Sequence, residues 1–155
     1  MAEEPEPQDP SRPGGSALDP QLSEWLQQRR QAVLATARRD GTPQTSNILF
    51  AFDGERAQIS VTASRAKTAN MRRHAGVVLH VLGDTFWQYA AITCIASLGP
   101  VSTEPGDQAG RDLLALYEQL AHPHSDPDEF FQAMVAEHRL VATLTPISAV
   151  ASGLD

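Results

Sequence analysis

The sequence predicts a mainly β protein with peripheral helices, built as a small barrel of about six antiparallel strands. Short segments of β-type composition are separated by Asp-Gly and Gly-Asp pairs, which favour tight turns between antiparallel strands. Amphipathic segments that open with cap residues occur only at a few points in this series. A barrel is favoured because closure of the sheet removes its exposed edges.

The first segment differs in composition from the rest of the chain. Residues 1–18 are rich in Pro, Gly, Glu and Ser and offer almost nothing to bury. Such a segment cannot offset its ordering entropy, so we predict a disordered tail over 1–18 and one domain over 19–155. Its acidic, proline-rich start is unlike a signal peptide. Asp19 and Pro20 then predict the start of a short helix that ends near Arg30.

Three strands and a helix are expected next. Asp-Gly pairs at 40–41 and 53–54 would turn the chain between the strands, which makes them a meander. Ser64 resembles a helix N-cap and ends the last of these strands. The predicted strands cover 32–38, 43–52 and 56–63, and the predicted helix covers 64–74.

The second half of the chain is expected to contribute three more strands, with two helices between the second and the third. Asp126 and Pro127 predict a helix start by the same cap and first-turn proline as Asp19 and Pro20. Pro146 has no N–H to donate, so one edge of the last strand should lie outside central ladder pairing. The predicted strands cover 76–82, 86–102 and 139–153, and the predicted helices cover 106–121 and 127–138.

Composition excludes several classes of protein. The formal net charge of −7 argues against a general nucleic-acid binder. Cys94 is the single cysteine, which excludes an internal disulfide and fits a reducing compartment, and its apolar neighbours predict a buried thiol. No apolar stretch approaches the length of a membrane span. We therefore expect a cytoplasmic protein without a nucleic-acid or membrane partner.

Several motifs with defined chemistry are absent from the sequence. It contains no GxGxxG after a strand, no GxxxxGK[ST], no HExxH and no GxSxG. His122 and His124 lie near Asp126 and Asp128 in the sequence, and side chains of these types can bind a metal ion. These residues fall in a predicted loop in which Asp126 is already explained as a helix cap, so we expect no metal.

The most informative segment is "VTASRAKTAN", where Arg65 and Lys67 fall in the first turn of the predicted helix. Cations are disfavoured at that end, because free N–H groups and the helix macrodipole already make it positive. Thr62, Ser64 and Thr68 add hydroxyl donors. A cluster made only of donors is favourable when it binds an anion, above all a phosphate. The alternative is two solvated cations on a surface helix.

The order of four segments resembles a known family. These segments are "VLATARRDGTPQTSNILF", a following strand, "SRAKTANMRR" and "WQYAAI". Together they look like the flavin-binding split β-barrel superfamily related to pyridoxamine 5′-phosphate oxidase, in particular its actinobacterial branch that uses the deazaflavin coenzyme F-420. The resemblance covers about residues 24–153. It implies a homodimer of split barrels with the cofactor bound across the subunit interface.

The resemblance also assigns the phosphate contacts and the ring contacts. Arg65 and Lys67 would hold the cofactor phosphate, with hydroxyl groups of the same segment as further donors. Side chains of the "QTSN" strand would offer polar contacts to the edge of the deazaflavin ring. The implied hydroxyl donors are Thr62, Ser64 and Thr68, and the implied ring contacts are Gln44, Ser46 and Asn47. Without the resemblance, Ser46 and Asn47 are equally explained as solvent-facing strand positions.

Two aromatic residues complete the implied site. Trp87 and Tyr89 would form a wall near the ring or the substrate, contributed by the facing subunit or strand. Their i, i+2 spacing places both on one face of the predicted strand, which core packing would also require. The chain departs from many relatives at Thr93 and Cys94, where those relatives carry Glu-Gly. The lost glycine predicts that a bulge is lost there as well.

The function implied by the resemblance is an F-420-dependent reductase. Such an enzyme transfers a hydride from the reduced 8-hydroxy-5-deazaflavin to a conjugated small-molecule acceptor. No covalent intermediate is needed, so no residue is assigned as catalytic with certainty; solvent and Tyr89 are the candidate proton donors, in that order. The alternatives are an FMN-dependent oxidase or reductase, a non-catalytic deazaflavin carrier, and a structural dimer with an empty site.

Overall fold

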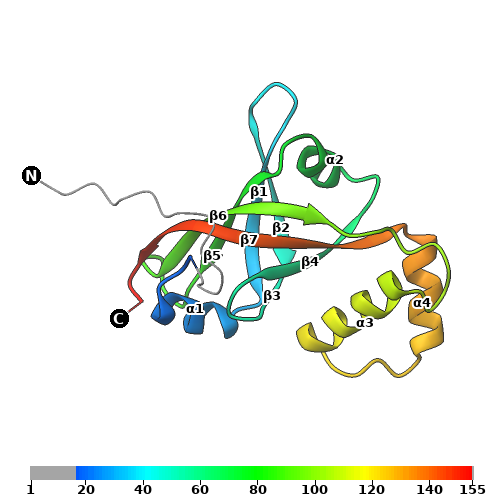
Figure 1. Ribbon diagram of the computed structural model, residues 1–155. Coiled ribbons are helices and arrows are strands. Elements are labelled where there is room, and N and C mark those ends of the chain that lie inside the picture. The colour runs from blue at the N-terminus through cyan, green and yellow to red at the C-terminus, as the bar shows by residue number, and fades with distance from the viewer. Residues whose placement is uncertain (1–16, 155) are drawn as a thin grey trace, which may run out of the picture.

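The structure is a computed structural model that describes residues 17–154, and it confirms the predicted mainly β split barrel. One antiparallel sheet curls into a half-barrel with helices on its periphery (Figure 1). It has seven strands instead of about six. The strands are β1 (Gln31–Ala37), β2 (Pro43–Leu49), β3 (Ala51–Phe52), β4 (Ala57–Thr62), β5 (Gly76–Leu82), β6 (Tyr89–Leu98) and β7 (Arg139–Ser152). The helices are α1 (Pro20–Gln27), α2 (Ala66–Arg73), α3 (Gln108–Leu120) and α4 (Pro127–Ala136).

The predicted tail lies almost entirely outside the described residues. Leu18, its last residue, is only 6% exposed and belongs to the hydrophobic core. The domain therefore includes Leu18, one residue more than predicted. Within residues 17–154, no helix is both long and apolar enough to cross a lipid bilayer.

The additional strand arises at Phe50, which divides the predicted strand 43–52 into β2 and β3. The order of strands in the sheet is β2-β1-β5-β6-β7-β4-β3, so β2 and β3 are its two edges. Phe50 is fully buried, and its N–H donates to the carbonyl of Arg30 at 2.8 Å. Because one residue connects the two edges, the sheet must curl until they meet.

Both predicted Asp-Gly turns are confirmed. Gly41 and Gly54 have φ angles of 87° and 103°, a region in which residues other than glycine are strained. Asp40 Oδ1 accepts from the N–H of Thr42 at 3.0 Å, and Asp53 Oδ1 accepts from the N–H of Glu55 at 2.8 Å. These short-range bonds hold the hairpins β1-β2 and β3-β4.

One edge of the last strand is unpaired beyond Leu144, as Pro146 led us to expect. β7 pairs with β6 along most of its length, but its pairing with β4 ends at Leu144, before the proline. The expectation that a bulge is lost at Thr93 and Cys94 is wrong. The register shifts between these two residues, because Pro146 pairs with Cys94 and Ser148 with Thr93. Ile147 is the extra residue, so the bulge lies in β7 and needs no glycine in β6.

The core fills the concave side of the sheet, and α1 covers part of it. Residues of alternate strand positions are buried there, together with α1 residues such as Leu26. Cys94 is among them, as predicted, and burial raises the pKa of its thiol to about 12. The largest fully buried strand residues are Leu34, Ile59, Leu79, Ile92, Leu140 and Leu144.

Side-chain caps define where three helices begin. Asp19 accepts from the N–H of Gln21 at 2.8 Å, and Asp126 accepts from that of Glu129 at 3.1 Å, as predicted for α1 and α4. Asp107 caps α3 and accepts from Gly110 N–H and, with its other oxygen, from Thr103 N–H. These hydrogen bonds, with those from the Glu104 N–H and the Ser102 hydroxyl, lower the pKa of the Asp107 carboxyl to about 2.

The lowered pKa of Asp107 predicts how stability depends on pH. Because the folded state holds the carboxylate below its ordinary pKa of 3.8, its contribution is complete above about pH 4 and is lost as the pH falls toward 2. We expect the difference in urea midpoint between wild type and Asp107→Asn to shrink over that range. Asp128→Asn is the control, since no hydrogen bond of the Asp128 side chain occurs within residues 17–154. Equal pH dependence of the two variants would contradict the prediction.

Candidate functional site

A groove of about 340 Å³ opens at the seam where β2 faces β4, beneath the first turn of α2. β2 and β4 are not neighbours in the hydrogen-bonded order of the sheet, so the curled sheet leaves side chains between them accessible. Four elements contribute to the groove. Its lining consists of Gln44, Ser46, Val61, Thr62, Arg65, Ala66, Lys67 and Arg139.

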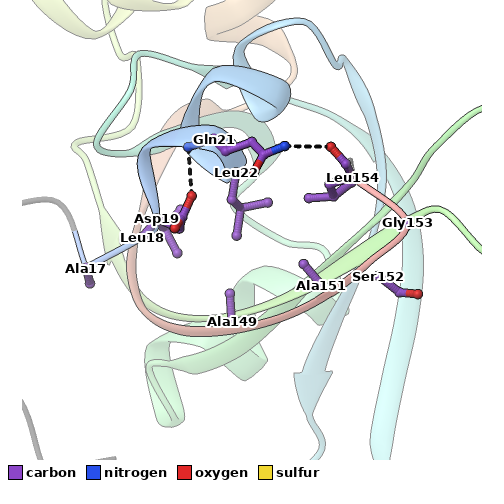
Figure 2. A pocket seen from close by; sticks show the side chains of 10 residues that line it. All are labelled: Ala17, Leu18, Asp19, Gln21, Leu22, Ala149, Ala151, Ser152, Gly153 and Leu154. Carbon is purple, nitrogen blue, oxygen red and sulfur yellow. Dashed lines mark hydrogen bonds between the residues drawn. The ribbon is translucent and has the colours of Figure 1, made fainter.

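A second cavity of similar volume lies where the two ends of the described chain meet (Figure 2). There, Gln21 Nε2 donates to the carbonyl of Leu154 at 2.9 Å. The lining is mostly small and apolar, with Asp19 as its one charged residue. None of the predicted site residues lines it. Charge therefore distinguishes the two cavities, and only the groove at the seam suits an anion.

The groove is positive because of how α2 begins. Arg65, and not the predicted Ser64, occupies the N-cap position of α2, with an extended backbone and no side-chain cap bond. The Arg65 carbonyl accepts from the N–H groups of Thr68 and Ala69, both at 3.1 Å. The N–H groups of Ala66 and Lys67 have no acceptor within residues 17–154. This end of α2 thus offers free donors beside two cationic side chains.

Lys67 is the only lysine in the sequence, and it lies in this groove. Partial burial lowers the pKa of its ammonium group, and the nearby Arg139 and Arg65 guanidinium groups lower it further. Within the described chain, Glu137 is the one carboxylate paired with these cations, with its Oε2 3.1 Å from Arg139 Nε. The groove therefore holds more positive than negative charge, and a bound phosphate would relieve this repulsion.

Arg139 is a site residue that the sequence did not reveal. It opens β7 and pairs with Thr62 of β4, which places a third cation beside Arg65 and Lys67. Its guanidinium also lies 3.5 Å from the Ser60 hydroxyl. In the sequence Arg139 follows a helix C-terminus, where a basic residue is common. No local signal separates these two roles, because the proximity depends on the pairing of distant strands.

The polar residues of β2 divide between its two faces. Gln44 and Ser46 are half-buried and line the groove. Asn47 is exposed on the opposite face, because successive side chains of a strand alternate. Asn47 therefore does not line the groove of its own chain, and its contact with the edge of a ring stays a prediction.

The three predicted hydroxyl donors lie at different places relative to the groove. Thr62 lines the groove, whereas Ser64 is exposed outside it. Thr68 is fully buried, and its hydroxyl donates to the Thr62 carbonyl at 2.8 Å. This hydrogen bond secures the start of α2 to the end of β4, and the contact of Thr68 with a phosphate stays a prediction.

Trp87 and Tyr89 do not reach the groove within one chain. β6 begins only at Tyr89, so Trp87 lies in the preceding loop, where it is 72% exposed and contacts the Phe86 ring edge-on. Tyr89 stacks on His80 and pairs with Ser152, at the opposite end of β7 from Arg139 (Figure 1). Since β7 has 14 residues, the two ends are roughly 40 Å apart at the usual strand rise.

A family model described as pyridoxamine 5′-phosphate oxidase matches residues 18–146. These residues include β2, β4 and α2 and the part of β7 that contributes Arg139 to the groove. The fold and the match together define the class of protein. The chain belongs to the pyridoxamine 5′-phosphate oxidase family.

Solved structures share this architecture. An F420 reductase is 23% identical, with a TM-score of 0.59, and the match covers 90% of this chain and 98% of that one. A conserved hypothetical protein of Mycobacterium tuberculosis is 21% identical, with a TM-score of 0.64 and 86% and 82% covered. An FMN-binding protein of Nostoc punctiforme is 12% identical, with a TM-score of 0.56 and 82% and 75% covered. At these identities the likeness concerns the fold.

The cation cluster predicts a measurable interaction between its members. Arg139→Gln should raise the pKa of the Lys67 ammonium, because it removes a cation that repels it. Phosphate should raise the same pKa if it binds beside Lys67. An NMR titration of the Lys67 side chain measures this without overlap, since the sequence has no other lysine. Arg111→Gln, on α3, is the control and should leave the titration unchanged; an equal shift in both variants would contradict the prediction.

Proposed function

We propose that the protein is an F-420-dependent oxidoreductase that passes a hydride from the reduced deazaflavin to a conjugated small-molecule acceptor. The observation that carries the proposal is the groove at the seam, where Arg65, Lys67 and Arg139 gather beside free N–H groups of α2. In a chain of net charge −7, this concentration of cations suits one phosphate. The F420 reductase among the similar structures supports this choice of cofactor.

The residues of the groove have distinct tasks in this proposal. Arg65 would grip two phosphate oxygens, while Lys67 acts as a point charge and Arg139 completes the neutralisation. Gln44 and Ser46, further along β2, would contact the polar edge of the ring and fix its orientation. The reduced cofactor, when bound, supplies the hydride. The protein would bind and orient both reactants and exclude water, and solvent would deliver the proton.

We further propose that the protein is a homodimer in which Trp87 and Tyr89 of one subunit approach the groove of the other. The sheet supports this, because its outer face carries apolar side chains that no part of residues 17–154 covers. A patch of this kind on a folded protein commonly marks an interface. Its exposed members from β2, β5, β6 and β7 are Leu49, Leu82, Ile95, Ile147 and Val150.

A second candidate is FMN-dependent oxidation or reduction on the same barrel. FMN also carries a phosphate, and one similar structure is an FMN-binding protein. A carrier that binds the deazaflavin without turnover would use the same groove. For each of these functions the buried Cys94 fits a reducing compartment, and we propose a cytoplasmic location.

Two measurements separate these functions. Purified protein is titrated with oxidised F-420 and with FMN, and fluorescence reports binding. Binding of F-420 supports the proposal, binding of FMN alone assigns the second candidate, and binding of neither overturns both. The protein with reduced F-420 is then supplied with quinones, enones and linear tetrapyrroles. Oxidation of the cofactor by one of them supports an enzyme, and turnover with none favours a carrier.

Loss of the lysine should weaken cofactor binding. We expect Lys67→Ala to reduce the affinity for F-420 by roughly 1.5–3 kcal/mol, the range for a hydrogen bond to a charged group. Arg72→Ala removes a cation from the same helix outside the groove, so it controls for net charge. A similar loss in both variants, or no loss with Lys67→Ala, would place the phosphate elsewhere.

The proposed dimer predicts a link between assembly and binding. Val150 is 66% exposed on the outer face of β7, so a charge there should disfavour apolar contact between subunits. We expect Val150→Asp to shift the light-scattering mass from dimer to monomer and to weaken F-420 binding in parallel. Val150→Thr is the matched control and should retain the dimer. A monomeric wild type that binds the cofactor fully would refute the shared site.

A further inference from the structure

A buried amide connects α2 to the hairpin β1-β2 behind the groove. Asn70 of α2 is 5% exposed, and its Nδ2 donates to Thr36 Oγ1 at 3.1 Å and to Gln44 Oε1 at 2.9 Å. Its Oδ1 accepts from Arg73 Nη2 at 2.7 Å. All three partners of the Asn70 amide group are thus side chains, and one of them, Gln44, lines the groove.

Chemistry fixes the direction of this chain of hydrogen bonds. A guanidinium group has only donors, so the atom of Asn70 that faces Arg73 must be the oxygen. The amide NH₂ of Asn70 must therefore face Gln44. Because that NH₂ only donates, Gln44 must present its oxygen to Asn70. The NH₂ of Gln44 is then the end of its amide left for the groove.

The free end of Gln44 is a pair of donors. Gln44 Nε2 has no acceptor within residues 17–154, although Gln44 lines the groove with Ser46 and Lys67. An amide without a fixed neighbour could turn and offer either its oxygen or its NH₂ to a ligand. In this protein, the turned amide would set NH₂ against NH₂ at Asn70 and leave buried donors unpaired.

We propose that Asn70 is a positioning residue that holds Gln44 as a hydrogen-bond donor, so that the groove selects a ligand with an acceptor at that edge. The identity of the ligand rests on the proposed function, and in a flavin or deazaflavin the acceptor is a carbonyl oxygen of the pyrimidine ring. A ligand with an N–H at the same position is disfavoured, because two donors would face each other with no acceptor between them.

Asn70→Asp reverses the direction of the hydrogen bond between residue 70 and Gln44 with little change in side-chain shape. The carboxylate accepts from Arg73 and also from Gln44, so the Gln44 amide turns and presents its oxygen to the groove. Gln119→Glu, an amide-to-carboxylate change on the exposed surface of α3, is the matched control. Both variants add one carboxylate, but only Asn70→Asp alters the direction of the hydrogen bond to Gln44.

The first readout uses the ligand-free protein. NMR couplings across hydrogen bonds identify which amide nitrogen donates to which carbonyl carbon. We expect a coupling from Asn70 Nδ2 to the Gln44 side-chain carbon in wild type and in Gln119→Glu. In Asn70→Asp, the coupling should run from Gln44 Nε2 to the new carboxylate. A wild-type coupling that starts at Gln44 Nε2, or a freely rotating Gln44 amide, overturns the proposal.

The second readout compares FMN with its 2-thio and 4-thio analogues, in which a sulfur replaces one carbonyl oxygen and accepts hydrogen bonds poorly. Wild type should bind one analogue on the order of 10-fold more weakly than FMN. Asn70→Asp should lose this preference, and the comparison is independent of its added charge because all three ligands carry the same phosphate. An unchanged preference overturns the proposal. Failure of wild type to bind FMN or F-420 contradicts the proposed function instead, while the couplings still decide the polarity.

Discussion

The fold depends on the single residue that connects the two edge strands. Phe50 joins β2 to β3, which lie at opposite edges of a seven-stranded sheet. The chain can satisfy this connection only if the sheet curls until its edges meet, and burial of the Phe50 ring stabilises the curl. β2 and β4 then face each other without a hydrogen-bonded ladder between them. The groove is this seam, so the closure of the barrel also creates the site.

Positive charge collects at the seam because β4 ends there and both α2 and β7 begin there. β4 leads into α2, which brings Arg65 and Lys67, and β7 begins beside them with Arg139. Partial burial of Lys67 and the neighbouring Arg139 and Arg65 guanidinium groups all disfavour its charged form, so the pKa of its ammonium group is lowered and the gathered cations carry a cost in free energy. A bound phosphate would offset that cost. The same repulsion between cations would therefore favour binding of an anion, which is the basis of the proposed phosphate site.

One chain supplies the polar half of the proposed site and lacks its apolar half. The groove offers charges and amides, while the exposed Trp87 and the half-buried Tyr89 lie near the far end of the sheet. The outer face between these ends carries exposed apolar side chains that nothing covers within the described residues. A second copy placed on that face would join the two halves, which is why we link assembly to cofactor binding.

The sequence by itself determined the features that depend on a few adjacent residues. These are the turns at Asp-Gly pairs, the helix caps at Asp19 and Asp126, and the cations around Lys67, because each follows from local backbone geometry or charge. Tertiary structure alone decided the break at Phe50 and the arrival of Arg139 beside Thr62, and it turned the Thr68 and Asn70 side chains inward. These features depend on the register between strands distant in sequence, and register is set by how the whole sheet buries its inner face.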